Sequence, residues 1–261
     1  MSFIRTISEM WKFRALTKAL VGRHLRTRYR GSVLGFIWSF LNPLCLIAVY
    51  ALVFKYYIRF DSVENYTLFL FAGLLPWIWF SSALLEACVS ISGGGSLITK
   101  AMFPPQVLPL VSVVTQLMNF LFAVPLLIAF MLYSGVVPNI SLIALPLILF
   151  NQFIFLLGLS LLFSAINVKF RDVQHILGNV VTLWFFLCPI LYPANVVPDK
   201  FKFTLILNPV AQYSEMYQSI FLNGQFPDWN SYVFTLLIAC VTFLFGNIVF
   251  DYFREDFAEF V

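Results

Sequence analysis

The sequence predicts an all-α membrane protein with six transmembrane helices, on two observations: its composition and its long apolar runs. Of the 261 residues, 61% are hydrophobic and 11% are charged, whereas a soluble domain has about 25% charged residues. A helix crosses the hydrocarbon core with about 20 apolar residues. Suitable runs lie near 33–57, 67–89, 108–134, 140–166, 174–192 and 231–251. We therefore expect one membrane domain over 33–261 rather than a soluble enzyme.

The positive charges predict the orientation of these spans, because cytoplasmic loops are enriched in Lys and Arg. Eight basic residues lie in the segment 1–32: Arg5, Lys12, Arg14, Lys18, Arg23, Arg26, Arg28 and Arg30. Four more share its side if six helices cross: Lys100, Lys169, Arg171 and Arg254. Only Lys55, Arg59, Lys200 and Lys202 fall on the other side. Both termini are therefore expected in the cytoplasm.

The segment 1–32 has the pattern of an amphipathic helix that precedes the membrane. Ile7, Phe13, Leu16 and Leu20 fall near one face, and most of the basic residues fall elsewhere. Such a helix lies flat at a membrane surface. Two interpretations stay open: a cytoplasmic partner pushes on the helix, or the segment only fixes the orientation and binds anionic lipid.

The loop at 90–106, SISGGGSLITKAMFPPQ, has the signals of a short helix between two long ones. Its glycines interrupt the preceding helix, Ser96 can cap a new one, and Pro104-Pro105 ends it. A short capped helix here suits insertion into a cleft of a partner. An ordinary flexible loop is the alternative.

The stretch 193–230, between the fifth and sixth runs, is too apolar for a solvated loop. Asn208 and Pro209 indicate an N-cap followed by proline at the first helical position, and Asn223-Gly224 marks the end. The helix between them has roughly 14 residues and a length of about 21 Å, too short for a core of ~30 Å. With a second short helix near 199–207, it predicts a re-entrant hairpin at the outer mouth.

Several kinds of chemistry are missing from the sequence. It has no phosphate-binding glycine loop ending in Lys-Ser or Lys-Thr, and no HExxH or CxxC motif. The one acidic residue inside a span is Glu86, either at the cytoplasmic rim or in the bundle interior. We expect no metal, no cofactor on this chain and no ion-gradient coupling. If the chain transports, another subunit must supply the energy.

Four stretches resemble one known family when they are taken together and in order. They read RTRYRGSVLGFIWSFLNPL at 26–44, LITKAMFPPQVLP at 97–109, FRDVQHILGNVVTLWFFLCPILYP at 170–193 and NPVAQYSEMYQSIFL at 208–222. They are similar to the permease subunits of type-2 ABC exporters for O-antigen and teichoic acid. Any one stretch alone is a weak signal, whereas the set is specific.

The resemblance implies a homodimer that pairs with two copies of a cytoplasmic ATP-binding subunit, which carries the ATP. The dimer would enclose a channel for an undecaprenyl-linked polysaccharide in the bacterial cytoplasmic (inner) membrane, with no nucleic acid as partner. On this basis residues 3–24 are the interface helix, and 96–105 form the coupling helix. The coupling residues are Ser96, Leu97, Thr99, Lys100 and Phe103. The outer gate near 198–222 holds Asn208, Pro209, Tyr213, Glu215 and Tyr217, although Glu215 can equally be a rim carboxylate in water.

Aromatic side chains are the candidates for the channel wall, because sugars present apolar C–H faces that pack on aromatic rings. The candidates are Phe36, Trp38, Tyr50, Trp184 and Tyr192. Arg28 and Arg30 are placed to meet the lipid pyrophosphate, because guanidinium matches phosphate geometry. The alternatives are lipid anchoring or core for the aromatic residues, and positive-inside anchoring for the arginines.

Three other functions compete with polysaccharide export. A permease of the same class for teichoic acid, a drug or a small lipid would share the architecture. A membrane-integral enzyme acting on lipid-linked sugars should show paired carboxylates or an Arg/His cluster, and the sequence has neither. A passive channel would need neither the glycine-rich loop nor the basic surface helix.

Overall fold

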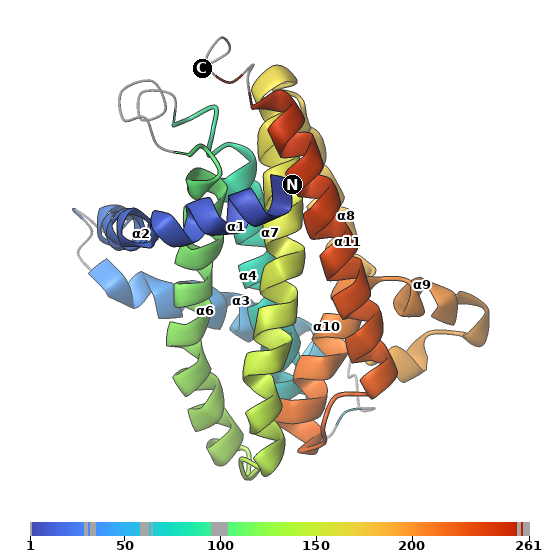
Figure 1. The fold of residues 1–261 in the computed structure, drawn as a ribbon. Helices are drawn as coiled ribbons and strands as arrows, with labels where there is room; N and C mark the ends of the chain where they lie inside the picture. The colour runs from blue at the N-terminus through green and yellow to red at the C-terminus, as the bar shows by residue number, and fades with distance from the viewer. Residues whose placement is uncertain are drawn as a thin grey trace.

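The computed structural model describes residues 2–28, 31, 35–57, 63, 65–94, 104–254 and 257, and within them it is helical with no β-strand. Four helical segments are long and apolar enough to cross a membrane: α4 (Tyr66–Cys88), α6 (Val107–Tyr133), Ile140–Lys169 and α11 (Trp229–Phe253). The third combines the 3-10 turn η3 (Ile140–Ala144) with α7 (Leu145–Lys169). Figure 1 shows α6, α7 and α11 side by side along the molecule. They match the second, third, fourth and sixth predicted spans.

The first and fifth predicted spans are shorter apolar helices in the structure. α3 (Trp38–Ala51) lies between a 3-10 turn, η1 (Gly35–Ile37), and a π-helical turn, η2 (Leu52–Tyr57). α8 (Val173–Phe186) ends before Pro189, although its apolar run continues to 192. Proline lacks an N–H and disfavours helical geometry in the residue before it. This explains why the fifth run divides into a helix and a turn.

Two helices, α1 (Ser2–Lys12) and α2 (Arg14–Arg28), form the predicted amphipathic N-terminal segment, with a turn at Phe13 between them. α1 crosses the bundle instead of running along it (Figure 1). α2 buries Val21 against Val107 and Val111 of α6. α1 carries its apolar residues on one face, and both helices lie on the surface of the bundle without entering it (Figure 1).

The stretch 193–230 holds short helices, as predicted. They are η4 (Ala194–Val196), η5 (Asp199–Phe201), α9 (Lys202–Ile206), α10 (Pro209–Gln218) and a π-helical turn, η6 (Ser219–Asn223). The predicted start and end of the main helix agree with the structure. The side chain of Asn208 accepts hydrogen bonds from the backbone N–H groups of Val210 and Ala211, and Gly224 ends the helix in left-handed conformation at φ +59°.

A close crossing in the bundle joins α7 to α11 through two glycines. A Cβ atom built on Gly246 would lie 2.1 Å from the carbonyl oxygen of Gly158, and one on Gly158 would lie 2.5 Å from the backbone nitrogen of Phe243. Small residues allow helix backbones to approach closely in a membrane. This crossing therefore fixes α11 against the centre of the bundle.

Candidate functional site

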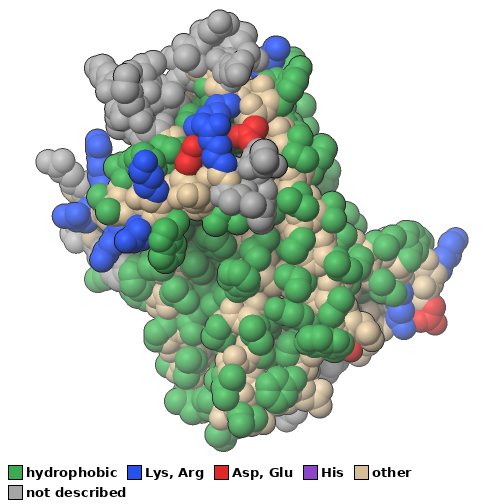
Figure 2. Space-filling model, in the orientation of Figure 1, with side chains coloured by type: hydrophobic (Ala, Val, Ile, Leu, Met, Phe, Trp, Pro, Cys, Tyr) green, Lys and Arg blue, Asp and Glu red, His purple; other side chains and the backbone are tan. Residues whose placement is uncertain are grey.

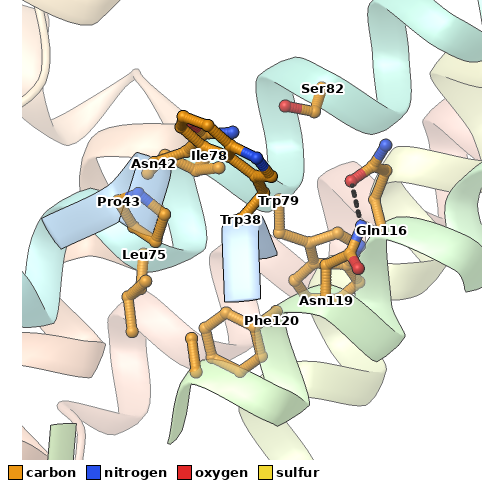
Figure 3. Close-up of a pocket in the computed structure, with 11 residues that line it drawn as sticks. Trp38, Asn42, Pro43, Leu75, Ile78, Trp79, Ser82, Gln116, Asn119 and Phe120 are labelled. Atoms are coloured by element: carbon orange, nitrogen blue, oxygen red, sulfur yellow. Dashed lines mark hydrogen bonds between the residues drawn. The ribbon is translucent and has the colours of Figure 1, made fainter. Parts of the chain in front are cut away.

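A polar groove made of two adjoining pockets lies between α3, α4, α6 and α8. The pockets have volumes of about 70 and 480 Å³, and both are lined by Asn42, Pro43, Ile78 and Ser82. Figure 3 shows the smaller pocket, where Trp38 and Asn42 of α3 face Ser82 of α4 and Asn119 of α6. No described residue lining either pocket is ionisable apart from Tyr50.

A line of polar side chains runs from α2 to the smaller pocket. Nδ1 of His24 lies 3.5 Å from Oε1 of Glu86. Nε2 of Gln116 donates to Oε2 of Glu86 over 2.5 Å, and Nδ2 of Asn119 donates to Oε1 of Gln116 over 2.9 Å. Among the described atoms, Oδ1 of Asn119 is buried without a hydrogen-bond partner. Buried polar atoms are normally satisfied, so this oxygen is the groove's best candidate to accept a hydrogen bond from a ligand.

Two of the five predicted channel aromatics line the groove. Trp38 lines the smaller pocket and Tyr50 the larger one. Tyr50 stacks on Phe185 of α8 with ring centroids 5.9 Å apart, and Trp77 of α4 packs 5.4 Å from the same Phe185. The result is an aromatic wall that three helices contribute.

The other three predicted channel aromatics are placed differently. Nε1 of Trp184 donates to Oδ1 of Asn208 over 2.9 Å, and its ring meets Phe80 edge-on at 5.5 Å. The hydroxyl of Tyr192 donates to the carbonyl of Phe186 over 2.9 Å. Phe36 lies in η1, and its side chain is outside the described part. The predicted pyrophosphate site also falls outside the described part, which includes neither the side chain of Arg28 nor Arg30. The same holds for the five predicted coupling residues: Ser96, Leu97, Thr99, Lys100 and Phe103.

The predicted gate residues on α10 bind the bundle core. The hydroxyl of Tyr213 donates to Oδ1 of Asn151 over 2.8 Å, and that of Tyr217 donates to Oε1 of Gln152 over 2.7 Å. Both tyrosines are fully buried, while Glu215 between them is half-buried. α10 is therefore fastened to α7 by two hydrogen bonds.

Asn208 and Pro209 join α8 to α10. Besides capping α10, Asn208 donates from Nδ2 to the carbonyl of Leu187 over 3.2 Å, and its Oδ1 accepts from Trp184. Pro209 occupies the first helical position, where its missing N–H costs nothing. The side chain of Asn208 thus holds the end of α8 and the start of α10 together.

A second cluster joins three distant segments at the end of the bundle that carries α1. Oε1 of Glu9 accepts a hydrogen bond from Arg5 over 2.9 Å, and its Oε2 accepts from Gln106, the residue before α6. Arg254 at the end of α11 lies 3.5 Å from the same oxygen. Burial raises the pKa of Glu9, but the hydrogen bonds and the nearby arginines outweigh it and hold the pKa below its usual range.

Sequence reasoning missed Asn42, Ser82, Gln116, Asn119 and Glu9. Gln116 and Asn119 did give a signal, because polar side chains one turn apart within a long apolar run need partners. Glu9 gave none, since its partners Gln106 and Arg254 are far away in the sequence.

The model for the family described as ABC-2 type transporter matches residues 15–222 of the chain. The chain belongs to the ABC-2 type transporter family. The matched part begins in α2, includes all of the groove and ends in η6. This confirms the resemblance drawn from the sequence, and together with the long apolar helices it makes the chain a multi-pass membrane protein.

Curated ABC-2 relatives cover almost the whole chain. The O-antigen export system permease protein RfbA of Myxococcus xanthus is 40% identical over 258 residues, 98% of this chain and 99% of its own length. The RfbA protein of Klebsiella pneumoniae is 33% identical, with 94% of each chain covered. The polysialic acid transport protein KpsM of Escherichia coli is 23% identical over 88% of this chain and 90% of its own.

Proposed function

We propose that the chain is the membrane-spanning subunit of an ATP-driven exporter that moves a lipid-linked, O-antigen-like polysaccharide across the bacterial inner membrane. The observation that carries this proposal is the chemistry of the groove. Its wall combines the rings of Trp38 and Tyr50 with the amides and hydroxyl of Asn42, Asn119 and Ser82. Rings can pack on the apolar faces of sugars, and amides can bond to their hydroxyls. A wall without full charges lets a polymer slide.

An exported polymer needs a path that is closed on all sides, and in this proposal two copies of the chain enclose that path. The groove of one chain has α3 and α8 on its walls, and these are the two apolar helices too short to count as spans by themselves. We propose that they are the first and fifth of six spans, and that two chains face each other across them. The names of the two RfbA relatives and their near-complete coverage support the same substrate class.

We further propose that two ATP-binding subunits drive this homodimer from the cytoplasmic side. The basic helices α1 and α2 would meet them, together with the coupling segment 96–105, and both termini would lie on that side. Glu9 supports this arrangement, because it ties α1 to Gln106, the residue next to the coupling segment. Arg28 and Arg30 would meet the lipid pyrophosphate there, and the short helices α9 and α10 would form the outer gate.

The test is ATP hydrolysis by the chain reconstituted with its ATP-binding partner, with and without lipid-linked polysaccharide. We expect the glycolipid to stimulate hydrolysis. Trp38→Ala should raise the glycolipid concentration for half-stimulation about fivefold, for ~1 kcal/mol of lost ring contact. Trp229→Ala, an exposed tryptophan outside the groove, is the matched control and should behave as the unaltered protein.

Hydrolysis that ignores the glycolipid in the unaltered protein would refute the proposal. The alternative is a permease of the same class for teichoic acid, a drug or a small lipid. Adding each of these in place of the polysaccharide distinguishes them, because only the transported class should stimulate hydrolysis and be sensitive to Trp38→Ala.

A further inference from the structure

A large apolar cavity lies beneath α1, between it and α6, α7 and α11. Its volume is about 900 Å³, within the range of about 300–1,000 Å³ that holds drug-sized ligands. Ile7, Met10 and Trp11 of α1 form its roof, and Leu157 of α7 and Phe243 of α11 form part of its floor. It shares no lining residue with the groove. Figure 2 shows hydrophobic side chains gathered below α1 on this face, with Lys and Arg beside them.

The lining indicates what can occupy this cavity. Every described residue that lines it has an apolar side chain, and water needs two to four polar partners to settle in a cavity. Phe150 and Leu244 at its rim are 61% and 46% exposed, so the cavity opens on the side that faces lipid. A hydrocarbon chain from the bilayer fits, because it is apolar and can enter from the lipid side.

The charges beside the cavity indicate which head group the chain carries. α1 and α2 together hold seven basic residues and one acidic residue, Glu9, and Glu9 is turned toward Arg5, Gln106 and Arg254. The guanidinium of Arg14 lies 5.1 Å over the ring of Trp11, which lines the cavity. Lys12 stands between them in the sequence. Basic groups beside a tryptophan at a membrane interface attract anionic phospholipid.

We propose that this cavity binds one acyl chain of an anionic phospholipid, with the phosphate of its head group against Lys12 and Arg14. The lipid supports α1 from below. On the other side of α1, Thr6 holds the helix to α11 and Glu9 holds it to Gln106. The inference does not depend on which polymer the chain exports. Its ligand is a component of the membrane and is bound with or without ATP turnover.

The experiment uses the full complex in vesicles with phosphatidylglycerol or phosphatidylcholine that carries a photoreactive group in the acyl chain. Peptides that become labelled on illumination are located by mass spectrometry. We expect phosphatidylglycerol to label the cavity segments of α1, α7 and α11 more strongly than phosphatidylcholine. Lys12→Gln and Arg14→Gln should each lower that labelling about fivefold. The double variant Arg23→Gln/Arg26→Gln on α2 removes two positive charges away from the cavity, more than either single variant, and should leave the labelling nearly unchanged.

A cavity-filling variant tests the acyl site itself. Ile154→Trp should abolish labelling of the cavity segments, and Leu244→Trp at the rim provides a second test if the first variant does not fold. Leu237→Trp, at an exposed position of α11 outside the cavity, is the matched control. Labelling that persists in both filling variants would overturn the proposal.

Other occupants give different results, and each would overturn the proposal. Equal labelling by the two phospholipids means that the head group is not recognised. Displacement of the label by equimolar undecaprenyl phosphate means that the cavity belongs to the substrate lipid. Cross-links between two copies of the chain at cavity residues mean that a second copy covers it. None of these outcomes depends on whether glycolipid stimulates ATP hydrolysis, so this test is separate from that of the exporter proposal.

Discussion

The hydroxyl of Thr6 donates a hydrogen bond of 2.6 Å to Oδ1 of Asn247, which joins α1 to α11 across 241 positions. Both side chains are buried. One turn further along α1, Glu9 reaches Gln106 and Arg254. A helix that lies across the bundle is thus fastened to it at two successive turns, which is what a helix needs if it is to transmit a push.

Thr6→Val keeps the shape of this side chain and removes its hydroxyl. The variant should loosen α1 by about 1 kcal/mol, the usual contribution of a hydrogen bond. Hydrogen exchange of the α1 amides measures this, and it should rise about fivefold while exchange in α4 stays unchanged. Thr6→Ser retains the hydroxyl and serves as control. Equal exchange in the valine and serine variants would show that the bond does not hold α1.

Docking of α1 should depend on pH through Glu9. Burial raises the pKa of Glu9, but hydrogen bonds from Arg5 and Gln106 and the charge of Arg254 hold it below its usual range. Gln106 and Arg254 reach Glu9 only when α1 is docked, so they make the docked state favour the carboxylate. The stabilisation of docking by the Glu9 carboxylate is complete above the usual glutamate pKa of about 4.3 and is lost as the pH falls through the lower, docked pKa. A spectroscopic distance between labels on α1 and α11 should therefore stay constant from pH 8 to about 5 and lengthen only in stronger acid.

Glu9→Gln is the matched variant for this titration. It removes the charge and should loosen α1 at neutral pH by about 1.5–3 kcal/mol, the contribution of a charged hydrogen bond, whereas in strong acid, where Glu9 itself is protonated, the two proteins should be alike. The distance should then no longer change in the strongly acidic range where it lengthens in the unaltered protein. A pH profile that survives unchanged in Glu9→Gln would assign the titration to another group.

The sequence predicted those parts of the fold that depend on neighbouring residues. Asn208-Pro209 and Gly224 marked the ends of a short helix correctly, because caps are local chemistry. The sequence did not predict the hydrogen bond from the Trp184 indole to Asn208, because Asn208 lies 24 positions away and is brought near only by the turn after α8. Gln116 and Asn119 were visible as polar breaks in an apolar run, but their link to Glu86 depends on how α4 and α6 pack.

Asn208→Ala should destabilise the region between α8 and α10 more than the loss of a helix cap alone. The cap contributes about 1 kcal/mol, and the indole N–H of Trp184 would lose its partner inside the protein, for about 1–3 kcal/mol more. Thermal unfolding followed by tryptophan fluorescence measures the sum. Asn208→Asp keeps an oxygen that can accept from the backbone of α10 and from the indole of Trp184. This variant should recover most of the lost stability. If alanine and aspartate are equally stable, the junction is held by other contacts.

Gly246→Ala should be among the most damaging single-methyl changes in the chain. Its Cβ would lie 2.1 Å from the carbonyl oxygen of Gly158, which is backbone and cannot rotate away, so α11 must move off α7. Forced overpacking costs about 1–3 kcal/mol and sometimes more. Gly178→Ala in α8 is the control, because no atom lies within 4 Å of its added Cβ, and alanine favours a helix by about 1 kcal/mol over glycine. The melting temperature of the purified protein should fall for the first variant and hold or rise for the second. Equal melting temperatures would mean that α7 and α11 do not approach as closely as the structure shows.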